Sequence, residues 1–343
     1  MINEIQRYIS RVVQGENLSR DDATRAFQIM LAGGATPAQI AALLVELRMK
    51  GETVEEVTGA ALVLRAKMET IVAPQGAIDV CGTGGDGMGT LNVSTAVALV
   101  VAACGVPVVK HGNKSVSSRS GSADVLSALG VNVQAEKALA EASLAAANIC
   151  FLLAPLYHKA MRHITPVRIE LGTRTIFNLL GPLINPANPK RQLMGVYDKA
   201  LLEPVAQVLK ALGSEKAWVV HGSDGIDELT LSGPTHVAQL ADGEVTLFEV
   251  TPEQAGFERT GLDSIKGADG MHNARELSLL LSGKRSAYRD VVLLNAAAAL
   301  MVADKVKSLP EGVALAARAV DEGRAKETLA SLALATNPRE VDA

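Results

Sequence analysis

The chain has 343 residues, of which 48% are hydrophobic, so it is long enough for two domains and apolar enough for an ordinary globular core. Its 33 basic and 37 acidic side chains leave a net charge of −4, which argues against a global attraction to nucleic acid or to an anionic membrane. The opening MINEIQRYIS lacks a secretory signal pattern, and Gly105 and Pro107 break the longest apolar run, residues 96–109, so we expect a cytoplasmic protein without a membrane segment.

The first 70 residues carry the signals of helices alone. Ser19 and Thr53 are candidate N-caps, and Thr36 followed by Pro37 is a cap with a proline in the first turn. Glycines at 33, 34 and 51 are typical helix ends, and apolar side chains recur at helical spacing after Thr53. We therefore expect a small helical bundle over residues 1–70.

After residue 75 the pattern changes to short β-rich runs that alternate with helical stretches. The runs cover residues 78–81, 106–109, 150–153, 192–196 and 217–220. Such alternation predicts a parallel sheet covered by helices. A hairpin is expected over residues 235–250, turning at Ala241, Asp242 and Gly243, and three Ala/Leu-rich helices close the chain.

The predicted fold is therefore α/β, with two parts. The first is an N-terminal helical domain of residues 1–70, joined by part of residues 155–186. The second is a larger α/β domain of residues 75–343, with a mostly parallel central sheet covered by helices.

The stretch DVCGTGGDGMGTLNVST, residues 79–95, places five glycines within eight positions between a predicted strand and a predicted helix. Backbone N–H groups of such a loop and the following helix N-terminus form an anion site, although a tight turn without a ligand is the alternative. The Rossmann and Walker spacings are absent, which argues against dinucleotide or Walker-type nucleotide binding. The oxygens of Asn92, Ser94 and Thr95 could hold a phosphate or a magnesium-bound water, while Asn92 is alternatively a simple N-cap.

A second polar stretch, KHGNKSVSSRSGSAD, follows the next predicted strand. It combines the cations Lys110, Lys114 and Arg119 with five serines at 115, 117, 118, 120 and 122. A solvated serine-rich loop is the alternative. Since open α/β sheets bind ligands at the carboxyl ends of their strands, two anion-binding loops there indicate a polyphosphorylated substrate.

An acidic pair, Asp227 and Glu228, stands at the expected start of a strand in HGSDGIDELTLSG. Adjacent strand residues face opposite ways, so the pair suits two Mg²⁺ ions or an irregular loop better than one shared ion. In isolation a solvated acidic turn is the simpler interpretation. Next to a phosphate site, the better interpretation is that the pair binds magnesium, which neutralises a departing pyrophosphate.

The stretch PLYHKAMRHITPVRIELGTRTIFNLLGPLINP contains an arginine of interest, Arg168, just after the helix-breaking Thr165 and Pro166. Its planar guanidinium could bind a carboxylate, although a surface arginine on a helix is the commoner case. His158 and His163 show no metal-ligand spacing, so we interpret them as structural or substrate-contacting. The three cysteines are far apart and fit reduced thiols.

Taken together, GTGGDG, NVST, KHGN, SGSAD, RTIFNLLGPLINP and DELTL resemble, in this order, the anthranilate phosphoribosyltransferases over nearly the full chain. The resemblance implies transfer of a phosphoribosyl group from 5-phosphoribosyl 1-pyrophosphate to the amine of anthranilate, in tryptophan biosynthesis. It also implies Mg²⁺, expected as two ions, a cleft between the two domains and a homodimer, with no nucleic acid or membrane as partner. No general base is required because the aromatic amine is neutral at pH 7, so no catalytic residue is assigned and catalysis is expected from orientation and metal.

The resemblance also assigns residues to each ligand. The phosphoribosyl pyrophosphate contacts are Gly82, Thr83, Gly84, Gly85, Asp86, Thr90, Asn92, Val93, Ser94, Thr95, Lys110, His111, Gly112, Asn113, Lys114, Ser115, Val116, Ser117, Ser118 and Ser122. The anthranilate contacts are Gly82, Asn113 and Arg168, and the metal ligands are Ser94, Asp227 and Glu228. Lys114 stands where relatives often have arginine, which keeps the charge but loses a bidentate fork.

Two other functions remain open at this point. A pyrimidine nucleoside phosphorylase-like enzyme would share the fold, but a KHSTGG-like loop is expected where this chain has VCGTGGDG. A non-enzymatic nucleic-acid-binding relative should be basic and lack both the acidic pair and KHGN.

Overall fold

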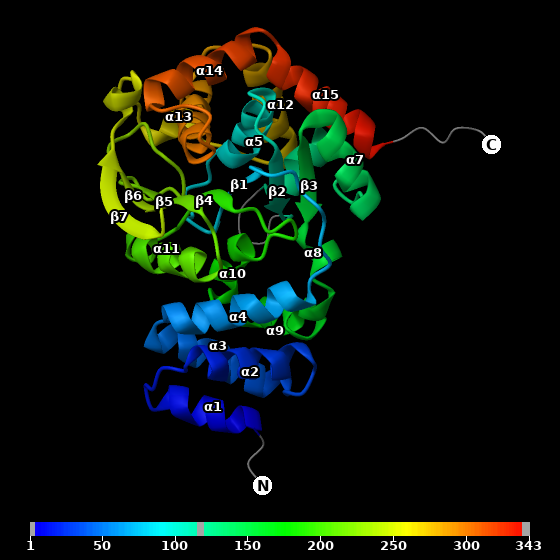
Figure 1. Ribbon diagram of the computed structural model, residues 1–343, viewed down its shortest axis with the longest axis vertical. Helices are drawn as coiled ribbons and strands as arrows, with labels where there is room; N and C mark the ends of the chain where they lie inside the picture. Colours follow the sequence, from blue (N-terminus) through cyan, green and yellow to red (C-terminus); the bar gives the residue numbers. More distant parts are fainter. Residues whose placement is uncertain (1–3, 115–119, 338–343) are drawn as a thin grey trace, which may run out of the picture.

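The structure is a computed structural model that describes residues 4–114 and 120–337. Its N-terminal part is a bundle of α1 (Glu4–Val13), α2 (Arg20–Leu31), α3 (Pro37–Lys50) and α4 (Val54–Lys67), at the lower end of the molecule in Figure 1. Ser19, Thr36 and Thr53 cap α2, α3 and α4 as predicted, the last two through capping boxes.

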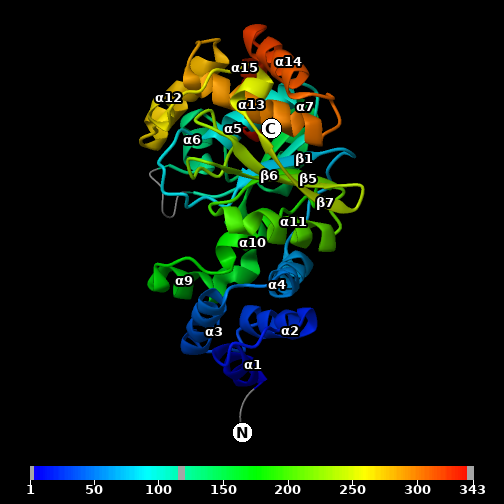
Figure 2. The same cartoon turned by 90° about the vertical axis from the view of Figure 1, so that its left-hand side faces the viewer.

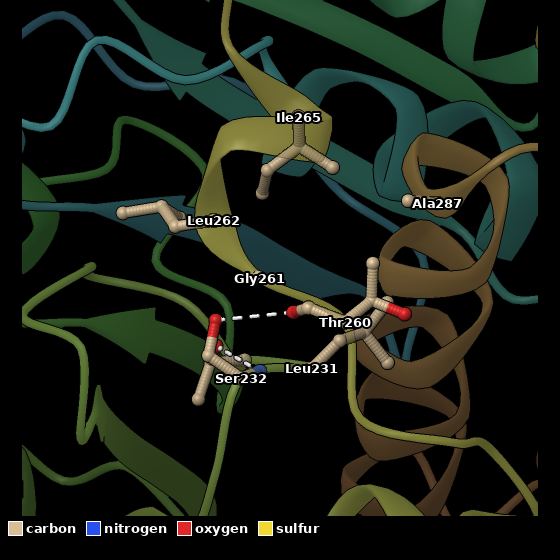
Figure 3. Close-up of a pocket in the computed structure, with 8 residues that line it drawn as sticks. Leu231, Ser232, Thr260, Gly261, Leu262, Ile265 and Ala287 are labelled. Carbon is tan, nitrogen blue, oxygen red and sulfur yellow. Dashed lines mark hydrogen bonds between the residues drawn. The ribbon is translucent and has the colours of Figure 1, made fainter.

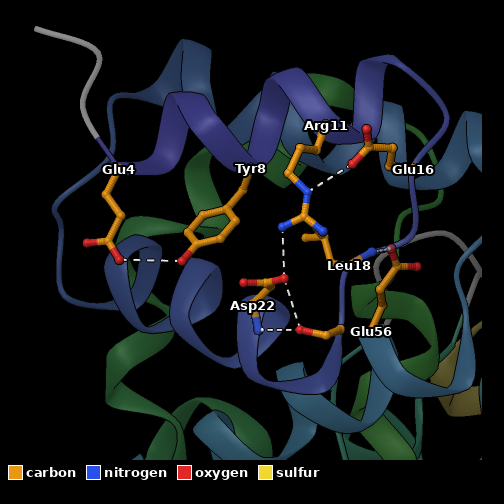
Figure 4. A network of polar contacts seen from close by, with 8 residues as sticks. Glu4, Tyr8, Arg11, Glu16, Leu18, Asp22 and Glu56 are labelled. Carbon is orange, nitrogen blue, oxygen red and sulfur yellow. Dashed lines mark hydrogen bonds and ion pairs between the residues drawn. The ribbon is translucent and has the colours of Figure 1, made fainter.

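A polar network ties the helices of the bundle together (Figure 4). Arg11 of α1 bridges Glu16 and Asp22 at 3.1 and 2.8 Å. Glu56 of α4 is fully buried, and its carboxylate accepts from the backbone N–H of Leu18 at 2.9 Å and pairs with Lys50 at 2.9 Å. These contacts satisfy a carboxylate that would be costly to bury alone.

The larger part is built on a seven-stranded sheet of order β3-β2-β1-β4-β5-β6-β7. The strands are β1 (Ile78–Gly82), β2 (Val108–Gly112), β3 (Ile149–Leu153), β4 (Arg191–Gly195), β5 (Lys216–Gly222), β6 (Thr235–Ala241) and β7 (Glu244–Val250). The first five are parallel, and β6 and β7 form the antiparallel hairpin with its turn where predicted. The α/β fold class with a mostly parallel sheet is confirmed.

Helices cover both faces of this sheet (Figures 1 and 2). Above it lie α5 (Val93–Ala103), α12 (Gly270–Leu281), α13 (Ala287–Val302), α14 (Leu309–Asp321) and α15 (Arg324–Thr336). Below it lie α10 (Phe177–Leu183) and α11 (Leu202–Ala211), while α6 (Ser122–Ala128) and α7 (Lys137–Ala147) lie near the β2–β3 end.

Two large hydrophobic cores follow from the strand alternation. Leu193 and Trp218 belong to the core with α5 and α13. Met194 and Val219, their neighbours along the strands, belong to the core that also contains α10, α11 and the bundle helices. The bundle therefore packs on the sheet domain through a continuous apolar core.

The short α8 (Ala154–Tyr157), the 3₁₀ turn η1 (Lys159–His163) and α9 (Thr165–Leu171) lead from the sheet to the bundle. There η1 packs on α2 and α9 on α3. Pro166 stands in the first turn of α9, so it begins a helix where the sequence was interpreted as breaking one.

Three further sequence expectations were wrong in detail. Strand β2 runs over 108–112 instead of 106–109, because Gly105 has a left-handed φ of +82° and Pro107 has no N–H to donate to a neighbouring strand. A fourth helix, α12, precedes the three helices expected at the end. Asp227 and Glu228 lie in an irregular segment between β5 and β6 rather than in a strand.

Candidate active site at the carboxyl edge of the sheet

Four parallel strands, β1, β2, β4 and β5, each end in a glycine, and the two in the middle of the sheet meet the acidic segment. Gly82 and Gly195 are paired across β1 and β4. A Cβ at Gly82 would lie 2.3 Å from Asp227 Oδ2, and one at Gly195 would lie 1.5 Å from the Asp227 carbonyl oxygen. Because no side chain fits there, these glycines let the acidic segment lie directly on the strand ends.

The glycine loop after β1 has the backbone conformation that its sequence suggested. Gly84, Gly85, Gly87 and Gly89 all have φ between +63° and +77°, which L-residues rarely adopt. At three of them, Gly84, Gly87 and Gly89, a Cβ would meet nothing within 4 Å. The loop thus presents exposed backbone next to open space, as a backbone anion site requires.

Two backbone N–H groups join this loop and α5 to the acidic pair. The N–H of Gly84 donates to Asp227 Oδ2 at 2.7 Å, and the N–H of Ser94 donates to Glu228 Oε1 at 3.1 Å. Withdrawal from water and then the nearby charge of Asp86 raise the pKa of Asp227 to about 7. Burial, followed by the charge of Asp227, also raises the pKa of Glu228 well above its usual range. Closely spaced acids of this kind are stabilised by a cation.

These residues fit Mg²⁺ better than a metal bound by protein ligands alone. In the described part of the chain no three His, Cys, Asp or Glu side chains lie close enough together to hold an ion. Mg²⁺ typically uses one or two carboxylates and completes its shell with water and substrate phosphates. Asp227, Glu228 and the hydroxyl of Ser94 are oxygen groups that fit such an incomplete protein ligand set.

Lys110 lies in strand β2 rather than in the loop after it, and is only 3% exposed. Its ammonium donates to Val80 O at 2.8 Å and to Ser94 Oγ at 3.2 Å. Burial lowers the pKa of Lys110, while the charge of Asp79 opposes that shift. The cation is therefore held beside Ser94, on the side of the sheet that carries α5.

His111 points to the opposite face, because successive strand residues alternate. Its Nδ1 lies 3.1 Å from Gly181 O, and its Nε2 lies 3.3 Å from Nε2 of His158. Burial lowers the pKa of both rings, to about 3 for His111, where the charge of His158 adds to the effect, and to about 4 for His158. Both rings are therefore neutral at pH 7. The side chains of His111 and Lys110 lie on opposite faces of the sheet.

Asn92 does not cap α5 with its side chain. Its amide instead donates to Ser120 O at 3.4 Å and accepts from Ser120 Oγ at 3.3 Å and from Asn273 Nδ2 at 2.8 Å. Val93 and Thr95 are buried, so neither side chain is open to solvent at the start of α5.

The other predicted contacts in the glycine loop, Thr83, Asp86 and Thr90, have partners within the protein. Thr83 accepts from the N–H of Tyr197 at 3.1 Å, Asp86 accepts from Met88, and Thr90 forms a bridge with Lys266.

The second polar loop is described only at its two ends. Asn113 and Lys114 are exposed after Gly112, and Ser122 donates to Asn113 O at 3.4 Å. The predicted contacts Ser115, Val116, Ser117 and Ser118, with Arg119, lie outside the described residues. An open hollow of about 490 Å³ next to this loop is lined by Lys114, Asp124, Ser127, Ala128, Asp269, Gly270 and Met271.

The three residues expected at anthranilate come from separate parts of the molecule. Gly82 is the last residue of β1 and Asn113 follows β2, while Arg168 is on α9 against the bundle. The Arg168 guanidinium lies 5.2 Å from the centre of the Phe177 ring, and burial lowers its pKa. Among the described residues no hydrogen bond or ion pair joins these three to one another.

Sequence reasoning missed several residues at this edge. Arg174 lies over the Tyr197 ring at 4.3 Å and donates to Gly85 O, which places a cation on the glycine loop. Asn295 lies in the apolar run VVLLNAAAAL, where a lone amide is itself a signal, since buried polar groups are almost always hydrogen-bonded. Gly195 gave no local signal, because its role depends on the distant Asp227.

A small pocket lies between residues 230–232 and the 3₁₀ turn η4 (Leu262–Ile265) (Figure 3). Its volume is about 10 Å³, room for a single water. It is lined by Thr230, Leu231, Ser232, Thr260, Gly261, Leu262, Ile265 and Ala287. The cavity is too small for a substrate.

No helix in residues 4–114 and 120–337 has the length and apolarity needed to cross a membrane.

Comparison with known proteins identifies the family. Residues 6–68 match the helical bundle domain, and residues 74–326 the a/b domain, of a glycosyl transferase family. The anthranilate phosphoribosyltransferase of Rhodopseudomonas palustris (strain BisA53) is 54% identical over 98% of this chain and 99% of its own.

Solved structures agree with this match. The anthranilate phosphoribosyltransferase of Thermus thermophilus superposes with a TM-score of 0.91 at 40% identity, covering 96% of this chain and 99% of its own. The Saccharomyces cerevisiae enzyme in complex with PRPP and Mg gives a TM-score of 0.89 at 27% identity, covering 97% and 98%. The chain therefore belongs to the anthranilate phosphoribosyltransferase family.

Proposed function

We propose how this chain carries out the reaction of its family, the transfer of a phosphoribosyl group from 5-phosphoribosyl 1-pyrophosphate to the amine of anthranilate. The products are N-(5-phosphoribosyl)anthranilate and pyrophosphate. This activity takes precedence over the phosphorylase-like and nucleic-acid-binding alternatives, because the similarity to anthranilate phosphoribosyltransferases extends over nearly the whole chain.

The assignment rests on two backbone hydrogen bonds to the acidic pair. Gly84 N–H donates to Asp227 and Ser94 N–H donates to Glu228, so the glycine loop and the start of α5 meet at the two carboxylates. We assign the pyrophosphate to Gly82–Asp86, Thr90 and residues 92–95. The ribose phosphate and the rest of the diphosphate are assigned to residues 110–118 and Ser122.

We assign Mg²⁺ to Ser94, Asp227 and Glu228, as two ions. A yeast relative contains PRPP and Mg, and the two carboxylates here contact different backbone segments, which favours one ion for each. When bound, magnesium neutralises the charge that develops on the departing pyrophosphate. The ammonium of Lys110, 3.2 Å from Ser94 Oγ, adds a fixed positive charge on the same side.

The anthranilate carboxylate is assigned to Arg168, with Asn113 and Gly82 nearer the sheet. A yeast relative binds 4-fluoroanthranilate, and the Arg168 side chain stacked on Phe177 has its guanidinium preorganised. The chain's own contribution to the chemistry is to hold the neutral amine in line with C1 of the ribose and to exclude water.

We also propose a helical domain of residues 1–70 joined by part of 155–186, an α/β domain of residues 75–343, a cytoplasmic location and a homodimer. The buried free cysteines at 81, 104 and 150 support a reducing compartment. The exposed apolar Val13 and Met49 on α1 and α3 support a partner surface on the bundle. Light scattering tests the dimer.

The loss of anthranilate fluorescence tests the activity. Purified protein with phosphoribosyl pyrophosphate and Mg²⁺ should consume anthranilate, and omission of either should stop the reaction. Equal consumption without phosphoribosyl pyrophosphate would contradict the proposal.

A further inference from the structure

Helix α13 presents two buried polar side chains toward the candidate site. Tyr288 and Asn295 are seven residues apart, about two helical turns, so they share one face of the helix. They are 3% and 0% exposed, and α13 packs against α5 and the sheet. Neither belongs to the substrate or metal contacts assigned above.

Tyr288 holds the segment that begins α5. Its hydroxyl donates to the carbonyl oxygen of Asn92 at 3.0 Å. Asn92 lies two residues before Ser94, which contacts Glu228 through its N–H and Lys110 through its hydroxyl. The phenol thus fixes the backbone on one side of the candidate metal site.

Asn295 holds the segment on the other side. Its Oδ1 accepts from the N–H of Leu229 at 2.9 Å, and its Nδ2 donates to Leu229 O at 2.9 Å and to Val291 O at 2.8 Å. One amide therefore binds both polar groups of the residue next to Glu228, as a neighbouring strand would. This contact replaces the strand pairing that the irregular segment lacks.

We propose that Tyr288 and Asn295 are positioning residues that set the spacing between the segment bearing Ser94 and the segment bearing Glu228, and so the affinity for Mg²⁺. The inference rests on the proposed metal ligands. The 3.1 Å contact from Ser94 N to Glu228 Oε1 is the point at which the two segments meet, and α13 holds a backbone group close to each side of it. Residues that orient metal ligands from behind typically change metal affinity about 10- to 100-fold when removed.

The test uses Tyr288→Phe, which removes one hydroxyl, and Asn295→Leu, which removes three hydrogen bonds at similar volume. The matched control is Thr336→Val on α15, because Thr336 is also buried and its hydroxyl accepts from Asn132 N at 3.1 Å and donates to Leu332 O at 2.9 Å. Calorimetric binding of phosphoribosyl pyrophosphate is titrated with Mg²⁺ in the absence of anthranilate. Thermal unfolding is measured in parallel.

We expect the half-saturating Mg²⁺ concentration to rise about tenfold in Asn295→Leu, and by less in Tyr288→Phe. Thr336→Val should lose thermal stability but keep the parental Mg²⁺ curve. Superimposed Mg²⁺ curves for the folded α13 variants and the parent would overturn the inference. If Asn295→Leu does not fold, the Tyr288→Phe curve decides.

A further arm separates this inference from the metal assignment. Glu228→Gln is titrated in the same way. A shifted curve for Glu228→Gln with parental curves for the α13 variants refutes only the positioning role. A parental curve for Glu228→Gln refutes the metal ligand itself, and the inference with it.

Discussion

Replacement of Gly195 by alanine should damage the active site although the new methyl group touches no substrate. The added Cβ would lie 1.5 Å from the carbonyl oxygen of Asp227, whereas real Cβ contacts essentially never fall below 3.0 Å. The Asp227 backbone must therefore move by about 1.5 Å, since β4 is fixed between β1 and β5. A misplacement of about 1 Å can cost roughly 100-fold in rate, close to 2.7 kcal/mol of transition-state stabilisation.

The assay is the steady-state loss of anthranilate fluorescence over a range of Mg²⁺ concentrations. We expect kcat/KM to fall about 100-fold in Gly195→Ala, with a higher Mg²⁺ requirement. Gly261→Ala is the matched control, because Gly261 has φ −66° and nothing within 4 Å of its Cβ position. A folded Gly195→Ala with parental kinetics and Mg²⁺ dependence would refute the reasoning that the glycine seats the acidic segment.

Three further predictions concern single side chains. Arg168→Ala should raise the KM for anthranilate by about 10- to 100-fold with little change for phosphoribosyl pyrophosphate, since a charge-assisted hydrogen bond contributes roughly 1.5–3 kcal/mol; equal steady-state effects on both substrates would mean that Arg168 binds something else. Asp227→Asn and Glu228→Gln should be inactive at low Mg²⁺ and partly recover at high Mg²⁺, because mass action refills a weakened site; initial rates that superimpose on the parent's would remove the metal role. In the folded protein the pKa of His158 is about 4, below its usual value of about 6.5. As the pH falls, the unfolded chain therefore takes up the proton first. The stability that depends on the neutral ring is complete above pH 6.5 and is lost as the pH falls toward 4. Chemical denaturation should therefore show the parent losing about 2 kcal/mol more than His158→Phe between pH 7 and 5, and parallel pH profiles would contradict the buried neutral ring.

Much of the fold was predictable because its signals are local. The caps at Thr36 and Thr53 act within four residues, and the turn at Asp242 and Gly243 is marked by two left-handed residues, with φ of +52° and +76°. Strand β2 was shifted because the apolar pattern runs through Val106 and Pro107, while the residue pairing with β1 begins at Val108.

The candidate site was predictable where family motifs exist, and less so where contacts are long-range. The glycine loop and the acidic pair are 143 residues apart at their hydrogen bond from Gly84 to Asp227, and no local pattern indicates that pairing. Asn92 looked like a cap, but tertiary contacts with Ser120 and Asn273 take its side chain instead. Asp227 and Glu228 lie outside a strand, and the next residue, Leu229, has its backbone hydrogen bonds from Asn295. A neighbouring strand would otherwise make these hydrogen bonds.

The central claim is that the glycine loop, the start of α5 and the acidic pair together form one site for a metal-bound diphosphate. A crystal of the protein soaked with phosphoribosyl pyrophosphate and Mn²⁺ in place of Mg²⁺ tests it most directly, because Mn²⁺ accepts the same oxygen ligands and can be located by its anomalous scattering. The account predicts anomalous peaks within ligand distance of Asp227 and Glu228, with the diphosphate on Gly82–Asp86. Mn²⁺ or diphosphate bound elsewhere, with the two carboxylates free of metal, would contradict it.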